Sequence, residues 1–520
     1  MESLVSLRPF VSENLRSALW FRPELALTLG TLFLFVIDLF WKKSAARVVY
    51  LATGTLLVLG LAAVLLARQP ADAQTLFNGM VANDAFAIFF KWLFLGAGAL
   101  TVLVAAQGKD FPPARIGEFF ALLVAIVLGM FMMASATDLL MVYLSIELVS
   151  MVSYVLAGYR KGDRKAAEGS LKYVIYGGVA SGVMLFGMSY LYGLTGTTNL
   201  FELGNRIQAI HATGASLAAT KIALVVAIVF VTAGIGYKVA AVPWHMWCPD
   251  VYEGAPTPFT AFLSVGPKAA GFALALRFFH SALAGPGSGP AGFADALAGI
   301  PWPAVVGVVS AVTMTLGNFT ALGQTNLKRL LAYSSIAHAG YTLMGLSAVS
   351  GRGVQAVMIY MLVYLVMNVG AFIVVIVVAE ATGSESILDY KGLAHRHPLA
   401  AVTFAIFLFS LTGLPPFAGF AGKWYLFYAV FERISGPGGS WYAVLALVGA
   451  LNTAVSLYFY MRIVRAMFID APYVENAAPI RPRIGYQLML GAASAFILVF
   501  GLWWTPMVQW TEASLQMFRG

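Results

Sequence analysis

Cysteine and charged residues are both scarce in this sequence. Only one of the 520 residues is a cysteine, Cys248, which excludes an internal disulfide framework. No Cys-x-x-Cys motif or Cys/His cluster is present to ligate zinc, an iron–sulfur cluster or c-type haem. Charged residues make up 11% of the chain and hydrophobic residues 60%, a balance that excludes an ordinary soluble domain. Any redox chemistry associated with this protein is therefore expected on another chain.

Long apolar runs dominate the sequence instead. A helix needs about 20 apolar residues to cross a hydrocarbon layer about 30 Å thick. The runs predict an all-α polytopic membrane protein with about fourteen transmembrane helices. The region up to Arg22 lacks the basic start and cleavage site of a signal peptide, so the first span is expected to be retained. The predicted spans are 23–41, 48–67, 80–107, 117–134, 138–159, 167–194, 218–251, 258–283, 303–322, 330–348, 355–379, 399–431, 442–468 and 485–508.

Basic residues are concentrated in alternate loops between the predicted spans. Lys42, Lys161 and Arg396 are examples from the basic side, whereas the other side has few lysines or arginines. Anionic lipid and the positive-inside bias explain this pattern and the net charge of +9 without a nucleic-acid partner. The basic loops are expected in the cytoplasm, which predicts a bacterial inner-membrane protein with both termini in the periplasm.

Proline and glycine interrupt the seventh and twelfth predicted spans, within 237–245 and 411–423, and a lysine lies at each break. Proline removes a helix hydrogen bond, and the freed carbonyl must face protein or water rather than lipid. The breaks are five helices apart, which predicts two inverted five-helix repeats, helices 4–8 and 9–13. The predicted divisions are 1–114 for helices 1–3, 115–284 and 285–470 for the two repeats, and 471–520 for helix 14.

Two ionisable residues of opposite charge lie deep within predicted spans. Glu147 is about halfway along the fifth span, where an isolated carboxylate is costly unless it is paired or protonated. Lys238, near the middle of the broken seventh span, is the predicted partner. Opposite unit charges about 4 Å apart attract by about 4 kcal/mol at an effective dielectric constant of about 20. Small electrostatic changes can therefore move a proton on or off such a pair.

Three further residues extend this predicted row. Lys268 lies in the next span among small residues that leave room for water. His338 lies mid-helix, and its two ring nitrogens can pass a proton onward. Lys423 follows the second break. The sequence thus predicts a lateral row of proton-transferring groups in the order Glu147, Lys238, Lys268, His338 and Lys423.

Five more ionisable residues are secondary candidates. Lys172 and Lys328 lie nearer helix ends, where reaching out to the lipid headgroups is as reasonable as proton transfer. For His245, a satisfied core histidine is an equally good interpretation. Asp250 and Glu253, at the cytoplasmic end of the seventh span, can attract protons, although solvated loop acids are common.

Four stretches resemble the antiporter-like subunits of respiratory complex I: Leu144–Ser150, Val242–Thr257, Asn326–His338 and Leu414–Lys423. The resemblance extends over essentially all the predicted helices, and the stretch around Glu147 and the chain length look most like the subunit N branch. It implies that Glu147 and Lys238 are the family's glutamate–lysine pair, Lys268 its bridging lysine and Lys423 its distal residue. The lysine at the distal position argues against a paralogue with glutamate there, and the lack of a long lateral helix argues against subunit L.

The resemblance implies a non-redox subunit that translocates protons while quinone is reduced elsewhere. It places NADH, FMN, iron–sulfur clusters and quinone on partner subunits, with no cofactor or metal on this chain. The implied partners are other membrane subunits of complex I, including paralogous antiporter-like subunits, together with lipid. Two alternatives stay open: a subunit of a cation/proton antiporter without redox partners, and a membrane scaffold whose polar residues are purely structural.

Overall fold

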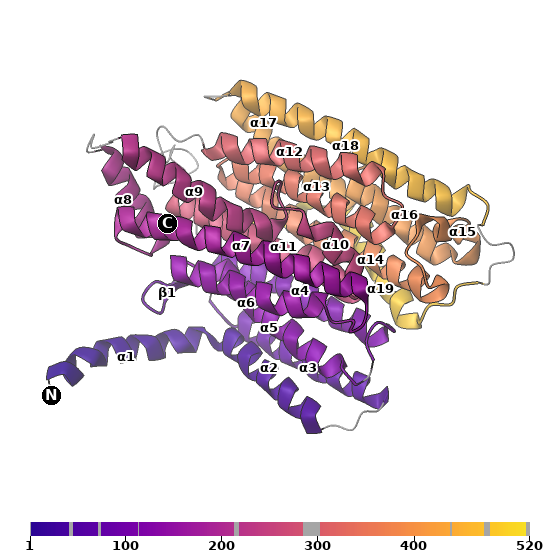
Figure 1. Cartoon of the computed structure of the whole chain (residues 1–520), viewed down its shortest axis with the longest axis horizontal. Helices are drawn as coiled ribbons and strands as arrows, with labels where there is room; N and C mark the ends of the chain where they lie inside the picture. Colours follow the sequence, from indigo (N-terminus) through magenta and orange to yellow (C-terminus); the bar gives the residue numbers. More distant parts are fainter. Residues whose placement is uncertain are drawn as a thin grey trace.

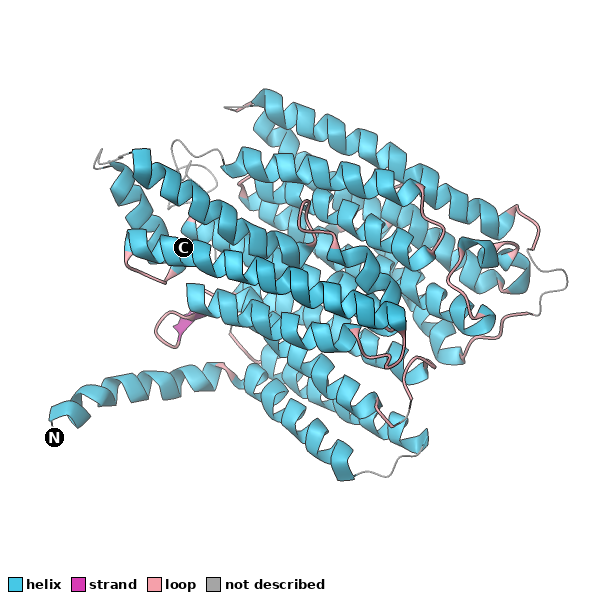
Figure 2. Cartoon of the chain, viewed as in Figure 1, coloured by secondary structure: helices cyan, strands magenta, loops and turns pink. Residues whose placement is uncertain are grey.

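The computed structural model describes residues 2–40, 45–70, 74–112, 114–212, 218–283, 302–436, 439–472 and 479–515. These ranges are almost entirely helical, and the long helices run side by side in one bundle (Figures 1 and 2). Within them, β structure is confined to a short hairpin, in which β1 (Gln74–Leu76) pairs antiparallel with β2 (Val81–Asn83), and to isolated bridges.

The helices fall into two successive groups along the chain. The first group is α1 (Glu2–Trp20), α2 (Arg22–Phe40), α3 (Ala45–Ala67), α4 (Ala85–Gln107), α5 (Ile116–Ser135), α6 (Leu139–Ala157), α7 (Arg164–Thr195), α8 (Leu200–Ala212), α9 (Ala218–Val239), α10 (Trp247–Gly254) and α11 (Thr257–Ala282). The second group is α12 (Trp302–Leu322), α13 (Leu327–Ser347), α14 (Gly351–Thr382), the 3-10 turn η1 (Ile387–Tyr390), α15 (Leu393–Arg396), α16 (Pro398–Thr412), α17 (Ala418–Ile434), α18 (Gly439–Phe468), α19 (Ile484–Leu502) and α20 (Thr505–Ser514).

The predicted all-α multi-pass architecture is confirmed. Twelve of the described helices are long and apolar enough to cross a membrane. The sequence-based number was higher because it also counted α13, and the interrupted pair α16 and α17, as spans. Both features exist as helices, but α13 has polar residues such as Ser334, Ser335 and His338 along its length, and α16 is short. Helices α1 and α8 lie outside the predicted spans.

Both predicted helix breaks are also confirmed. Residues 240–246 separate α9 from α10, and residues 413–417 separate α16 from α17. In each case the first residue after the helix is left-handed: Ala240 has φ +58° and Gly413 has φ +88°. A single left-handed residue stops a right-handed helix and turns the chain away from its axis.

Carbonyl groups freed at the two breaks find donors inside the protein. The indole Nε1 of Trp247 donates to the carbonyl of Tyr237 at 3.1 Å, and Lys423 Nζ donates to the carbonyl of Thr412 at 2.8 Å. Both acceptors lie in the last turn of the helix before the break. The interior thus meets the requirement that non-helical backbone at membrane depth be satisfied by protein.

Helix α11 is the centre of the bundle, because every one of its residues is buried. Helix α14 is buried along most of its length, whereas α7 leaves large apolar side chains such as Leu171, Val179 and Phe186 exposed. An outer helix with an apolar exposed face suits contact with hydrocarbon. Figure 1 shows α7 along the outside of the bundle and α11 behind it. The central position of α11 brings Lys268 into contact with both groups of helices.

Candidate functional site

Lys238 is buried at the end of α9 and is held by a side chain of α6. Its Nζ donates to Ser150 Oγ at 3.0 Å. Its methylene stem packs against α11, where a Cβ added to Gly271 would lie 3.3 Å from Lys238 Cγ. Because Gly271 has no side chain, the stem of Lys238 can pass over α11 at this point. Lys268 lies three residues earlier on α11, one turn away.

Glu147 lies one turn before Ser150 on α6, but it does not contact the lysine directly. No hydrogen bond or ion pair within 4.0 Å joins Glu147 to Lys238 among the described residues, and Glu147 Oε1 is buried without a hydrogen-bond partner. The predicted pair is therefore indirect. Ser150 contacts Lys238, and Glu147 lies one turn before Ser150 without contacting the lysine. An unpartnered buried carboxylate oxygen is costly, and it is ready to accept a proton or a cation.

Lys268 is the hub of the second group of contacts. Its Nζ donates to Ser335 Oγ of α13 at 2.6 Å, and the same oxygen accepts a hydrogen bond from Tyr364 of α14 at 2.9 Å. The hydroxyl of Tyr252, from α10, lies 3.4 Å from Ser335 Oγ, and the Lys268 ammonium lies 5.7 Å from the Tyr252 ring centroid. Helices α10, α11, α13 and α14 thus meet at one serine hydroxyl.

His338 follows Ser335 by one turn on α13 and is enclosed by tyrosines. Its Nδ1 is hydrogen-bonded to the hydroxyl of Tyr360, and its Nε2 lies 3.3 Å from the hydroxyl of Tyr460. The ring of Tyr364 lies 5.2 Å from the imidazole, centroid to centroid. Both ring nitrogens therefore face hydroxyl groups that can donate or accept a proton.

Lys423 ends the row at the second helix break. Besides donating to the carbonyl of Thr412, its ammonium lies 4.3 Å from the ring centroid of Tyr341. The Tyr341 ring in turn lies 6.0 Å from the imidazole of His338. The five residues predicted from the sequence thus lie on α6, α9, α11, α13 and α17, and serine or tyrosine side chains contact the three lysines and the histidine.

Three of the secondary candidates, Lys172, Asp250 and Glu253, lie away from this row, at the helix ends that carry the basic loops. Lys172 is partly exposed and forms ion pairs with Glu168 and Asp250, each at 2.6 Å. Asp250 and Glu253 both bind Arg329, at 2.6 and 2.8 Å. These residues form a charged cluster, in which the acids are neutralised by basic neighbours.

Lys328 does not reach outward to headgroups, which excludes one of the two interpretations that the sequence left open for it. The residue is fully buried, and its ammonium donates to the carbonyls of Glu253 and Ala255 at 2.9 and 2.8 Å. It also pairs with Glu385 Oε1 at 3.1 Å. His245 lies in the first break with its Nδ1 buried and without a hydrogen-bond partner.

The sequence interpretation missed two buried ion pairs near the opposite helix ends. Lys91 of α4 binds Glu24 of α2 at 2.6 Å, and Arg277 of α11 binds Asp84 through two hydrogen bonds of 2.8 and 2.9 Å. Both pairs fasten the N-terminal helices to the centre. A detectable signal was present, since each residue is a charge within or bordering a predicted span.

Chemically, the row is suited to moving protons. Its groups each gain or lose a proton, and the hydroxyls between them donate and accept in either direction. An ammonium held by a neutral oxygen can release its proton without leaving a buried anion behind, whereas a direct ion pair cannot. Lys238, Lys268 and Lys423 all have such neutral acceptors.

Comparison with known proteins identifies close relatives. Residues 136–451 match the family model for the transmembrane region of NADH:quinone oxidoreductase and Mrp antiporter proteins. The chain is 82% identical to NADH-quinone oxidoreductase subunit N of Anaeromyxobacter sp. (strain Fw109-5), over 99% of this chain and 100% of that protein. It is 45% identical to NADH-quinone oxidoreductase subunit N 2 of Sorangium cellulosum, over 99% and 100% of the two chains.

Two solved assemblies contain chains of the same fold. A chain of respiratory complex I from Thermus thermophilus superposes with a TM-score of 0.74 at 28% identity, covering 94% of this chain and 98% of that one. A chain of the Mrp complex from Dietzia sp. superposes with a TM-score of 0.75 at 20% identity, covering 97% and 100%. At that lower identity the second likeness concerns the fold alone.

Proposed function

Because this chain belongs to the family of transmembrane subunits of NADH:quinone oxidoreductase and Mrp antiporters, we propose that it acts as subunit N of a respiratory NADH:quinone oxidoreductase. In that role it translocates protons across the membrane while quinone is reduced elsewhere in the complex. Other membrane subunits, including antiporter-like paralogues, are its partners. NADH, FMN, the iron–sulfur clusters and quinone are bound by partner subunits, and this chain contributes no covalent catalysis.

The observation that carries the proposal is the contact between Lys268 and Ser335. It joins an ammonium of α11 to a hydroxyl of α13 inside the bundle, at 2.6 Å. From this contact the row extends one way through Lys238 and Glu147, and the other way through His338 to Lys423. If the row instead ended at lipid, protons could not pass between the two groups of helices.

We place the chain in the bacterial inner membrane with both termini in the periplasm. The positive-inside bias supports this orientation, because the basic loops between the spans then face the cytoplasm. The inverted repeats and the divisions at 115–284 and 285–470 belong to the same proposal. Helices α7 and α14, which correspond in the two repeats, each contain 32 residues. The region 284–301, which includes the proposed boundary, lies outside the described residues.

The experiment compares Lys268→Met with Lys172→Met in the assembled complex reconstituted into liposomes. Lys268→Met is expected to lower NADH-driven proton pumping by at least about tenfold, as for loss of a proton-transferring group. Lys172→Met removes a partly exposed lysine outside the row and is expected to leave pumping unchanged. Co-purification of each variant chain with NADH-reducible flavin and iron–sulfur signals verifies that both complexes are assembled. Full pumping by Lys268→Met would instead support the scaffold hypothesis.

The alternative function, a cation/proton antiporter subunit without redox partners, is not favoured, because the Dietzia Mrp chain shares only the fold. The two functions differ in what purifies with the chain. We expect a tagged chain to carry NADH-reducible flavin and iron–sulfur signals through purification in mild detergent. A pure antiporter complex would lack both signals.

A further inference from the structure

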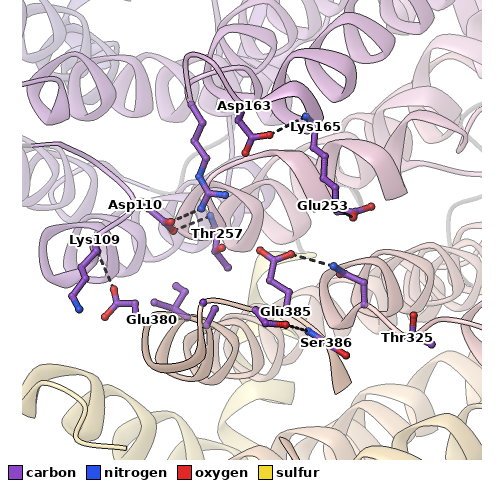
Figure 3. Close-up of a pocket in the computed structure, with 16 residues that line it drawn as sticks. Lys109, Asp110, Asp163, Lys165, Glu253, Thr257, Thr325, Glu380, Glu385 and Ser386 are labelled. Atoms are coloured by element: carbon purple, nitrogen blue, oxygen red, sulfur yellow. Dashed lines mark hydrogen bonds and ion pairs between the residues drawn. The ribbon is translucent and has the colours of Figure 1, made fainter. Parts of the chain in front are cut away.

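A polar cavity of about 600 Å³ opens beside the basic ends of the helices. It is bounded by the loop after α4, the loop between α6 and α7, the start of α11, the start of α13 and the segment after α14. Figure 3 shows Asp110, Glu253, Glu380 and Glu385 arranged around the same space, although they come from separate parts of the chain. None of the residues in the proton-transfer row lines this cavity.

Carboxylates gather around the cavity although the loops beside it are basic. Its described lining has more carboxylates than basic groups: Asp110, Asp163, Glu253, Glu380 and Glu385 against Lys109, Arg160 and Lys165. Several of these carboxylates are already engaged. Asp110 binds Arg160 and accepts from the backbone of Thr257, and Glu380 accepts from the backbone of Lys109 at 2.9 Å. Ion pairs to Arg160, Lys165, Arg329 and Lys328 compensate much of this charge, so the space offers a proton carboxylate oxygens rather than a large excess of negative charge.

Glu385 joins the cavity to the protein interior. Its Oε2 accepts a hydrogen bond from Asn326 at 3.3 Å, and its Oε1 pairs with the buried Lys328 at 3.1 Å. Lys328 lies in the first turn of α13, where the positive end of the helix dipole opposes an ammonium. The helix dipole therefore destabilises the Lys328 ammonium, which lowers the free-energy cost of removing its proton.

The helix that carries Lys328 also carries the partner of Lys268. Ser335 is seven residues further along α13, or two turns, which is a rise of about 10 Å. Seven residues place the two side chains on the same side of the helix. Helix α10 contacts α13 at both of these positions. The carbonyl of Glu253 accepts a hydrogen bond from Lys328, and the hydroxyl of the preceding residue, Tyr252, lies 3.4 Å from Ser335 Oγ.

We propose that this cavity is the proton-uptake vestibule of the chain, and that Glu385 and Lys328 pass protons from it to Ser335 and Lys268. The proposal rests on the function proposed above. In each transfer the Lys328 ammonium releases a proton across intervening water to the Ser335 hydroxyl, which passes a proton to the neutral amine of Lys268. The Glu385 carboxylate then takes a proton from the vestibule and passes it to the neutral amine of Lys328, which restores the ion pair.

The test uses Lys328→Met, Lys328→Arg and Glu385→Gln in the assembled complex in liposomes. Arginine keeps the positive charge and can bind the same oxygens, but it does not release its proton near neutral pH. A purely structural lysine would therefore be rescued by arginine, whereas a proton-transferring lysine would not. We expect all three variants to lower NADH-driven pumping by at least about tenfold. Glu380→Gln is the matched control, since Glu380 lines the same cavity without touching Lys328.

The outcomes separate this proposal from the function on which it rests. If Lys268→Met loses pumping while Lys328→Arg and Glu385→Gln pump normally, the vestibule assignment is wrong and the proposed function stands. If Lys268→Met itself pumps normally, the proposed function fails first. Should Lys328→Met prevent assembly, Lys328→Arg and Glu385→Gln still decide the question. Equal losses in Glu380→Gln and Glu385→Gln would also overturn the assignment, because they would indicate a general effect of cavity charge.

Discussion

Helices α6 and α13 begin in the same way. Asp138 caps α6 by accepting from the backbone of Leu140, and Asn326 caps α13 by accepting from the backbone of Arg329. Each cap also forms an isolated β-bridge to the segment that follows the next long helix, from Asp138 to Asn199 and from Asn326 to Ser386. The two groups of helices thus repeat a small backbone arrangement, which supports the proposed repeats.

The two helices differ nine residues after these caps. At that position α6 has Glu147, whereas α13 has Ser335, the acceptor for Lys268. Three residues later α6 has Ser150, the acceptor for Lys238, and α13 has His338. The first half therefore places a carboxylate beside its lysine, and the second half surrounds its ionisable groups with neutral hydroxyls. We therefore expect the carboxylate of the first half to respond to changes of nearby charge, and the hydroxyls of the second half to pass protons.

The largest expected effect follows from removing the carboxylate. Glu147→Gln keeps the size of the side chain but abolishes its charge, so Lys238 loses its anionic neighbour. We expect NADH-driven proton pumping to fall about a hundredfold, a typical loss for a group that takes part in proton transfer. Pumping is measured by fluorescence quenching in proteoliposomes. Glu147→Asp, which keeps the charge, should recover part of the rate; equal loss in both variants would mean that shape rather than charge matters.

Removing the hydroxyl acceptors should distinguish the two halves. Ser335→Ala deprives Lys268 of its hydrogen bond, and hydrogen bonds to charged groups contribute about 1.5–3 kcal/mol. We expect pumping to fall about tenfold, since 1.4 kcal/mol corresponds to that factor. Ser150→Ala should have a smaller effect, because Glu147 still supports Lys238 electrostatically. A larger loss in Ser150→Ala than in Ser335→Ala would contradict the assignment of roles to the halves.

The sequence predicts the framework of this site better than its contacts. Apolar runs and the two breaks are strong signals, because lipid imposes a fixed length and forbids unsatisfied backbone. Charges such as Lys268 stand out for the same reason. Hydroxyl residues such as Ser335 and Tyr360 do not, since serine and tyrosine are common in apolar helices and their partners are set by packing. The sequence left two interpretations open for Lys328, because nearness to a helix end does not reveal which loop folds over it.

A third prediction concerns the backbone at the two breaks. Gly413 has φ +88°, and a Cβ there would lie 2.7 Å from Lys423 Cδ. Gly413→Ala is expected to destabilise the chain by about 1 kcal/mol through the left-handed conformation alone. The first break already has alanine at the corresponding place, Ala240, so Ala240→Gly should be nearly neutral. The measurement is the temperature at which the purified complexes lose this subunit, and equal shifts in both variants would contradict the expectation.

The smallest effect is expected at His338, because each nitrogen of its imidazole ring has a tyrosine hydroxyl as partner. Tyr460→Phe removes the contact of 3.3 Å to Nε2, and a neutral hydrogen bond of this kind contributes about 1 kcal/mol. The Nδ1 contact to Tyr360 remains, so proton transfer through the imidazole keeps one hydroxyl neighbour. We expect pumping in liposomes to fall by less than about threefold in Tyr460→Phe and by more in Tyr360→Phe. The reverse order would mean that protons reach His338 from α18 rather than from α14.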